Sequence, residues 1–166
     1  MIRPETEDSR DVVAAADSIE PGKGAHLSAK EVRELEQYVN AVRERLHLTH
    51  WTVWIAADPA EEGVHASVHP TEGRFIAMIY FATDWRDQPE DILRNTITHE
   101  LLHLVHRDQT DTIRCALQDS GYLPEKAFTL LWRAFALHTE AMVDHLAGVL
   151  APTMPPAPTP SREAHA

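Results

Sequence analysis

Residues 96–108, which read TITHELLHLVHRD, hold three histidines and a glutamate within eight positions. His99 and His103 are four residues apart, a separation that on an α-helix gives about 6 Å of rise and about 40° of rotation. Both imidazoles then project from one face toward a common point, as two nitrogen ligands of Zn²⁺ do. Glu100 is offset from His99 by about 100°, so its carboxylate reaches a water on the metal without binding the metal. This H-E-x-x-H pattern predicts a metal site with a general base.

Apolar residues surround the histidines, which bears on whether they have a special partner. Ile97 precedes the pattern, and Leu101, Leu102, Leu104 and Val105 follow within it or directly after it. Two sides of this helix are therefore expected to be buried, and a buried imidazole costs free energy unless it has a partner. The alternative is a polar helix face whose histidines have ordinary hydrogen-bond partners.

His106 is the third histidine, and its role stays open. On a straight helix it lies on the same face as His99 but about 10.5 Å further along the axis, so one ion cannot easily bind both. His106 is then a ligand on a bent helix, a residue in the wall beside the metal, or an ordinary polar residue. Two histidines do not complete a zinc site, so a third ligand must come from elsewhere.

The elements that must position these residues can be read in chain order. Ser28 and Glu31 match a capping box, and apolar residues at helical spacing follow it. These are Val32, Leu35, Val39, Val42 and Leu46. HWTVWIAA (50–57) is rich in β-branched and aromatic residues and is expected to be a strand. HASVH (65–69) and RFIAMIYFA (74–82) are expected to pair as a hairpin closed by PTEG.

Helices are expected in the second half of the chain. Asp87-x-x-Glu90, with Pro89 in the first turn, is expected to open the helix that carries the histidines. DSGYLP (119–124) marks a break. Residues 124–150 then form one long helix that is apolar on more than one side, and we expect it to be central.

Composition limits the classes of function. The chain has 166 residues, 43% of them hydrophobic, and a formal net charge of −11. We expect an acidic disordered arm over 1–26, a single domain over 27–150 and a disordered Pro-rich tail over 151–166. The acidic charge argues against general nucleic-acid or membrane binding. A single cysteine, Cys115, excludes an internal disulfide, and with no apolar signal or membrane segment a cytoplasmic location is expected.

The HELLH segment resembles the zincin metallopeptidases, although two related patterns do not fit it fully. The metzincin pattern HExxHxxGxxH has a glycine where this chain has His106 and a third histidine where it has Gln109. The bacterial ribosome-maturation endoribonucleases share LHL and the position of Asp108, but they have glycine at the position of Glu100. This chain therefore lacks the third ligand of both patterns.

The gluzincin branch supplies the third ligand from a later helix, where a glutamate is followed four residues on by an aspartate. HTEAMVDHLAG provides Glu140 and Asp144 at this spacing. The resemblance implies that Glu140 binds the metal and that Asp144 accepts a hydrogen bond from a ligating imidazole. On a helical wheel, the neighbours within about 60° of Glu140 are Asp144 and mostly small apolar residues, so a buried acid there would need a partner. A local cap or salt bridge of Glu140 is the alternative.

In size and order of elements, the chain is similar to the minimal zincins, such as the ImmA/IrrE-like and SprT-like peptidases of phage and bacterial genomes. This resemblance implies an α+β, zincin-like fold. A small antiparallel or mixed sheet of about three strands would pack on the H-E-x-x-H helix and on a long C-terminal helix.

The function that the resemblance implies is a zinc metallopeptidase acting on a peptide or protein substrate. His99, His103 and Glu140 would hold Zn²⁺, and Glu100 would serve as general base. Tyr122, His106 and His138 are candidate donors to the oxyanion, and the strand 75–81 is a candidate edge for an extended peptide. Two alternatives remain. One is a zinc-binding phage or bacterial structural or anti-defence interaction protein that is not a peptidase. The other is a hydrolase of another amide or of RNA.

Overall fold

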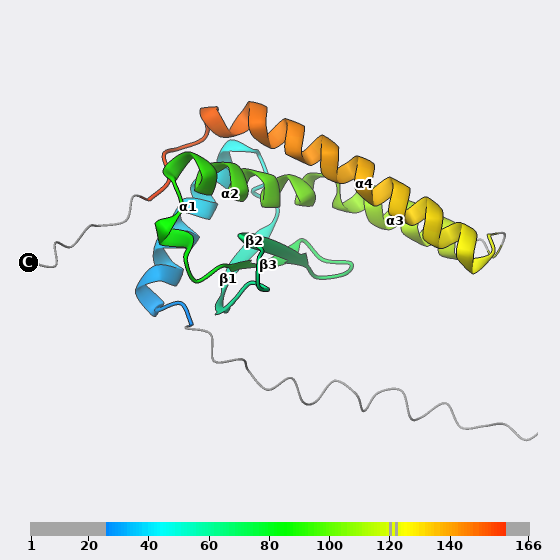
Figure 1. The fold of residues 1–166 in the computed structure, drawn as a ribbon, viewed down its shortest axis with the longest axis horizontal. Coiled ribbons are helices and arrows are strands. Elements are labelled where there is room, and N and C mark those ends of the chain that lie inside the picture. Colours follow the sequence, from blue (N-terminus) through cyan, green and yellow to red (C-terminus); the bar gives the residue numbers. More distant parts are fainter. Residues whose placement is uncertain (1–25, 120, 122, 159–166) are drawn as a thin grey trace, which may run out of the picture.

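A computed structural model describes residues 26–119, 121 and 123–158 of the chain (Figure 1). Helix α1, Ala29–Arg45, begins at the predicted capping box. The Ser28 hydroxyl accepts a hydrogen bond from the Glu31 N–H, and the Ser28 N–H donates to the Glu31 carboxylate at 2.8 Å. The predicted apolar face of α1 packs toward the sheet, with Leu35, Val39 and Val42 buried. The expected arm over 1–26 lies almost wholly outside the described residues.

A three-stranded mixed sheet follows α1. It contains β1 (Thr52–Pro59), β2 (Ala66–Pro70) and β3 (Ile76–Phe81), in the order β1-β3-β2. The predicted hairpin is confirmed, since β2 pairs antiparallel with β3, whereas β1 pairs parallel with β3. Because β3 is paired on both sides, the suggestion that strand 75–81 presents a free edge is wrong. The two edge strands are β1 and β2, and β2 is the edge that contacts α2.

Helix α2 (Glu90–Val105) is the central helix of the fold. It contacts β2 on one side and α4 (Glu125–Leu150) on the other. Ile97 and Leu101 join the main core with the sheet and α1, whereas Leu102 packs against α4. The expectation that two sides of this helix are buried is confirmed. The described residues thus form an α+β fold of four α-helices and a small mixed sheet.

The start of α2 differs from the prediction. Trp85–Asp87 forms a short 3-10 helix, η1, and Pro89 occupies the N-cap position of α2 without a side-chain cap. Asp87 therefore does not cap α2, and it lies instead in η1, where its backbone N–H donates to the Asp84 carbonyl. The negative charges of Glu90 and Asp91 still lie in the first turn of α2, where they stabilise the helix by interacting with the positive end of its dipole.

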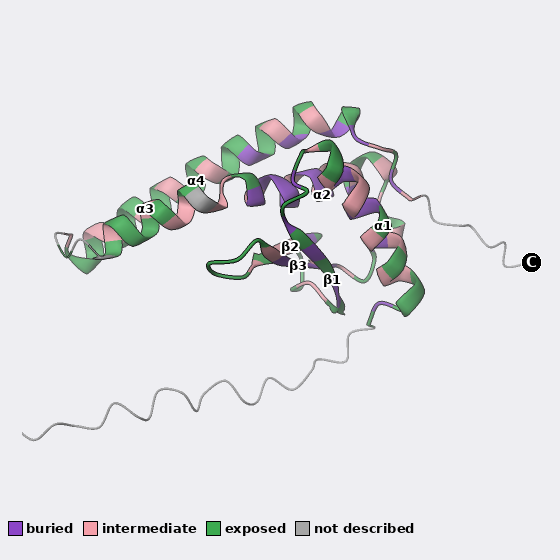
Figure 2. Ribbon diagram, turned by 180° about the vertical axis from the view of Figure 1, so that it is seen from behind, coloured by how far each residue is buried: buried purple, intermediate pink, exposed green. Residues whose placement is uncertain are grey.

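Helices α3 (Arg107–Asp119) and α4 form a hairpin that projects beyond the sheet (Figure 1). Figure 2 shows buried residues concentrated in the sheet and α2, whereas the hairpin is mostly exposed or intermediate. Among the described residues of α4, only Val143 and Ala147 are buried. The prediction that α4 is central is wrong. Its second apolar side faces solvent, and α2 takes the central position instead.

The segment 151–158 corrects the expectation of a disordered tail beginning at 151. A short 3-10 helix, η2 (Ala151–Thr153), continues α4, and Ala151, Met154 and Ala157 are buried. The Tyr38 hydroxyl donates to the Pro155 carbonyl at 2.9 Å, and the Ala157 N–H donates to the Glu90 carboxylate at 2.8 Å. The segment 151–158 is therefore packed on the fold, through Ala151, Met154 and Ala157. The rest of the predicted tail, 159–166, is outside the described residues.

None of the helices in the described part of the chain combines the length and apolar character that crossing a membrane requires.

Candidate metal centre

Helix α2 presents His99 and His103 from successive turns of one face. Their Nε2 atoms lie 3.0 Å apart, and the ring centroids are separated by 4.8 Å. Both rings are partly covered, with exposed side-chain fractions of 16% for His99 and 28% for His103. Burial lowers the pKa of His103 below its usual value, outweighing the opposing effect of Glu140. This favours the neutral imidazole, which is the form that binds metals.

Helix α4 brings two carboxylates to the same point. The Glu140 carboxylate lies 3.1 Å from His99 Nε2 and 3.6 Å from His103 Nε2. Asp144, one turn later, lies 3.0 Å from the other ring nitrogen of His99, Nδ1. The sequence resemblance implied this division between the two acids, and the structure brings all four side chains together. The site is built across the contact between α2 and α4, where Leu102 packs against Val143 and Ala147.

The donor atoms of His99, His103 and Glu140 lie close enough together that they could share one metal ion. One ligand atom from each of His99, His103 and Glu140 lies within 4.8 Å of the others. Tetrahedral ligands at about 2.0–2.1 Å from Zn²⁺ are about 3.3–3.4 Å apart. The Nε2 atoms of His99 and His103 are 3.0 Å apart, and Glu140 places one oxygen 3.1 Å from His99 and its other oxygen 3.6 Å from His103, which is close to this value. Two imidazole nitrogens with one carboxylate are also a donor set of catalytic zinc sites, so these residues fit the group that the sequence implies.

Glu100 lies beside this group but is far more buried, with 8% of its surface exposed. Its carboxylate accepts a hydrogen bond of 2.8 Å from the Val68 N–H on β2. Burial raises the pKa of Glu100 to about 7, and the nearby Glu140 adds to this, while the Val68 hydrogen bond opposes it. A carboxylate with a raised pKa next to possible metal ligands has the properties of a general base.

A cleft of about 670 Å³ opens over the metal centre, between β2 and the α2–α4 contact. One wall is the edge strand β2, and Val68 is among the residues that line it. The opposite wall comes from α4, where Trp132 stacks on Phe135 with ring centroids 5.6 Å apart. Both aromatic residues and all four clustered side chains border this single space. The cleft therefore offers room for an extended ligand directly beside the cluster.

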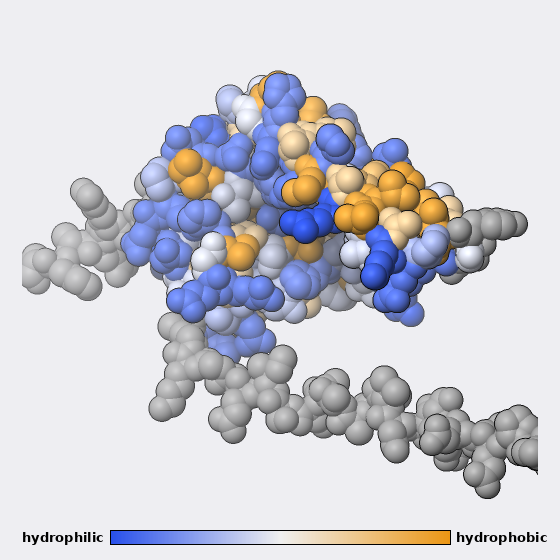
Figure 3. Space-filling view, turned by 45° about the vertical axis from the view of Figure 1, so that its right-hand side comes forward, coloured by the Kyte–Doolittle hydropathy of each residue, from blue (hydrophilic) through white to orange (hydrophobic). Residues whose placement is uncertain are grey.

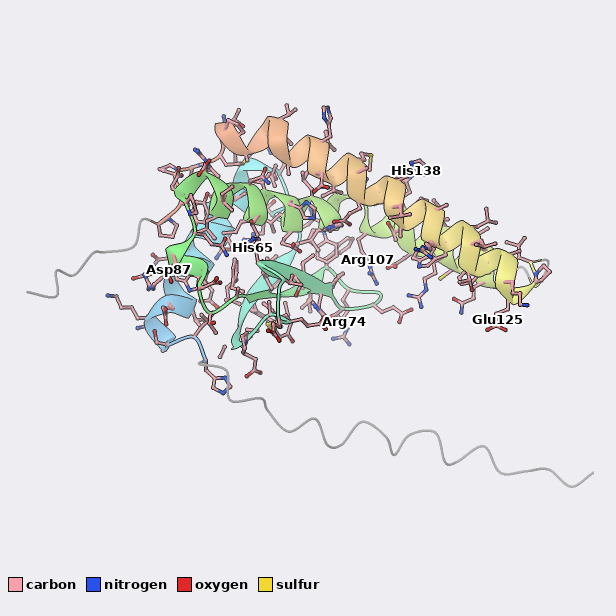
Figure 4. All side chains as sticks on the ribbon, viewed as in Figure 1. His65, Arg74, Asp87, Arg107, Glu125 and His138 are labelled. Atoms are coloured by element: carbon pink, nitrogen blue, oxygen red, sulfur yellow. The ribbon has the colours of Figure 1, made fainter. Side chains whose placement is uncertain are left out.

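The other predicted site residues are placed differently. His106 ends α2 with non-helical backbone angles and lines the cleft, and its buried Nε2 has no hydrogen-bond partner among the described residues. It is therefore a wall residue, and the three grouped donors do not include it. His138 is exposed on the outer side of α4 and does not border the cleft, so it cannot donate to an oxyanion there (Figure 4). Tyr122 lies outside the described residues.

Sequence reasoning missed several residues of the cleft. The spacing of Phe128, Trp132 and Phe135 could have indicated an aromatic stack on one helix face, and the structure contains that stack. The sequence gives no signal that this stack borders the cleft. Arg107 and His65 also line the cleft (Figure 4), and the Gln88 side-chain amide donates to His65 Nδ1 at 2.9 Å.

Comparisons with protein-family models, with curated proteins and with solved structures give no match for this chain. The zincin resemblance therefore stays a prediction from the HELLH and Glu140–Asp144 patterns.

Proposed function

We propose that this protein is a zinc-dependent metallopeptidase. His99, His103 and Glu140 would hold the metal, and Glu100 would act as the general base. The observation that carries the proposal is the convergence of three possible ligand atoms within 4.8 Å of one another. Beside them lies the buried carboxylate of Glu100, which is not one of the three. A site with a purely structural role has no use for a base in that position.

Glu100, Asp144 and His106 each have a distinct part in the proposed reaction. The zinc ion, when bound, would polarise the scissile carbonyl and lower the pKa of a water. Glu100 takes the proton of the attacking water and passes it to the leaving amine. Asp144 fixes the His99 ring through Nδ1, which leaves Nε2 free to bind the metal. His106 borders the cleft and would be the candidate donor to the oxyanion.

The edge strand supports a peptide as the substrate. The Ala82 N–H donates to the His65 carbonyl, so residue 65 faces β3. Alternation along an antiparallel strand then turns the backbone groups of Ala66 and Val68 away from β3. The Val68 N–H donating to Glu100 agrees with this orientation. An extended peptide that pairs with this edge would place its carbonyl groups beside the donor cluster.

Charge inside the cleft also favours a peptide over RNA. Of the described acidic and basic residues that line it, three are carboxylates, from Glu100, Glu140 and Asp144, and Arg107 is the single arginine or lysine. One bound divalent cation would not give this wall the run of positive charge that a phosphate backbone requires.

The test combines metal analysis with a peptide-library digest. The purified wild-type chain is expected to bind one zinc per chain and to cleave peptides in a chelator-sensitive manner. Glu100→Gln should keep the zinc and abolish cleavage, whereas Glu140→Ala should lose stoichiometric zinc. Glu125→Ala is the matched control, because Glu125 is an exposed acid at the far end of the same helix (Figure 4). A Glu140→Ala variant that retains stoichiometric zinc would show that the ligand assignment is wrong.

A further inference from the structure

The outer face of α4 carries an apolar surface that nothing in the described part of the chain covers. Half of the exposed large hydrophobic residues in the described part of the chain lie on this helix, and Leu130 and Leu137 are 70% and 63% exposed. Figure 3 shows apolar side chains gathered over the projecting hairpin. Single exposed apolar residues are common, but a contiguous apolar face usually marks an interaction site.

The face has a regular pattern of large and small residues. Leu130, Ala134, Leu137 and Ala141 are all exposed and are spaced by four, three and four residues. At 100° per residue they lie within about 60° of one another, so they form one stripe along the helix. We call these four residues the Leu/Ala stripe. It lies well round the helix from Val143 and Ala147, which face α2.

The stripe is complementary to itself when two helices run antiparallel. A two-fold axis midway between Ala134 and Leu137 sets Leu130 opposite Ala141 of the second copy, and Ala134 opposite Leu137 of the second copy. Each of the four layers then pairs one leucine with one alanine. Such pairs let the leucine fill the space left by the alanine as the helices approach closely. An unrelated partner would not require this symmetry.

Charges beside the stripe favour the same arrangement. Lys126 and Arg133 lie on one flank in the N-terminal half of α4, and Glu140 and Asp144 lie on that flank in the C-terminal half. In an antiparallel pair, equivalent flanks face each other, so the basic half of each copy meets the acidic half of the other. Both carboxylates also contact His99, at 3.1 Å and 3.0 Å, so the second copy would approach their exposed sides, since their side chains are 54% and 67% exposed. A parallel two-fold pair would instead bring this flank against the opposite flank of the second copy, where Leu131 and His138 lie, and would leave these charges unpaired.

From these observations we infer that the protein forms a two-fold symmetric homodimer in which the Leu/Ala stripes of two α4 helices pack antiparallel. The interface is isologous and closed, because each copy uses the same stripe and the axis passes through its centre. The inference does not depend on the metal or on hydrolysis.

Size-exclusion chromatography with light scattering on the full chain tests this directly. The wild type is expected at twice its 18.7 kDa chain mass at micromolar concentration. Leu137→Glu should raise the dimer dissociation constant by about 100-fold or more, because the change is made in both copies. Ile92→Glu is the control, since Ile92 is an apolar residue on α2 with a comparable 42% exposure. It should leave the dimer unchanged, and circular dichroism should show both variants folded.

A swap within one layer tests the register. Ala134→Leu alone opposes leucine to leucine and should weaken the dimer by about 10-fold. Adding Leu137→Ala restores one leucine and one alanine to that layer and should recover most of the affinity. A wild type that is monomeric, including one that binds phospholipid vesicles instead, would overturn the inference. A dimer that survives Leu137→Glu, or a double variant no tighter than Ala134→Leu, would overturn it as well.

Discussion

Replacing Asp144 with alanine should weaken zinc binding without removing a ligand. The carboxylate lies 3.0 Å from His99 Nδ1 and fixes the ring so that Nε2 faces Glu140 and His103. A hydrogen bond to a charged group contributes about 1.5–3 kcal/mol. Because the Asp144 side chain is 67% exposed, solvent screening reduces this contribution to about 1–2 kcal/mol. We therefore expect about a 5- to 30-fold loss of zinc affinity.

Competition with a chromogenic zinc chelator measures this affinity directly on the purified apo-protein. Asp144→Asn keeps a neutral oxygen acceptor near His99 and should lose only about 3-fold, which separates the charge from the hydrogen bond. Glu125→Ala, on the same helix but outside the cleft, should bind zinc as the wild type does. The reasoning fails if Asp144→Ala binds zinc within about twofold of the wild type. It fails equally if that variant loses as much affinity as Glu140→Ala, because Asp144 would then be a ligand.

Three further predictions concern the supports of the cleft. Leu102→Ala should destabilise the fold by about 2–4 kcal/mol in urea unfolding, and it should also weaken zinc binding because Leu102 seats α4 on α2. Tyr38→Phe should cost about 1 kcal/mol through the lost hydrogen bond to Pro155. Burial raises the pKa of Tyr38 to about 12 from 10.0, so the fold favours the neutral phenol. The stabilisation that this raised pKa gives is fully present below pH 10 and is lost as the pH rises from 10 to 12. Only the wild type should show this loss, because phenylalanine has no group that titrates. Arg107→Gln should reduce any preference for acidic side chains in the peptide digest.

The controls for these variants come from neighbouring positions. Leu104 is also buried on α2 but belongs to the core on the sheet side. Leu104→Ala should therefore lower stability without an added loss of zinc affinity, and equal zinc losses in the two variants would contradict the role given to Leu102. Arg74→Gln lies outside the main cleft and should leave the cleavage preference unchanged. A Tyr38→Phe variant with the same alkaline transition as the wild type would assign that transition to another group.

Local signals in the sequence determined the elements well. The Ser28–Glu31 capping box acts within one turn, and the hairpin turn at PTEG joins strands that are adjacent in the chain. Both depend on interactions over a few residues, which spacing alone can identify. The parallel pairing of β1 with β3 could not be read in this way, because it joins segments separated by β2.

The predictions that were wrong concern long-range packing. Apolar residues on two sides of α4 predicted a central helix, but periodicity does not say whether a second apolar side faces the core, solvent or another chain. The same limit applies to the edge strand. An almost continuous apolar run in β3 agreed with burial, and its neighbours β1 and β2 took the two outer positions of the sheet.

The metal centre was predictable in part for a geometric reason. The positions of His99 and His103 relative to each other follow from helix geometry alone. Glu140 is 37 positions beyond His103 in the chain, and only the resemblance to gluzincins pointed to it. The cleft walls depended on where the α3–α4 hairpin projects, and that direction follows from the turn at His106, which the sequence did not signal.

The two ends of α4 are held very differently. Its C-terminal end continues into η2 and is anchored by buried Met154 and Ala157, whereas its N-terminal half contacts mainly α3 beyond the sheet. A tilt of the helix would therefore turn about a point near Val143. Trp132 lies about 16 Å from that point along the axis, so a tilt of about 10° moves it by roughly 3 Å. Because Trp132 forms part of the cleft wall, a small tilt of the hairpin would change the width of the cleft, whereas Glu140, three residues from Val143, would barely move.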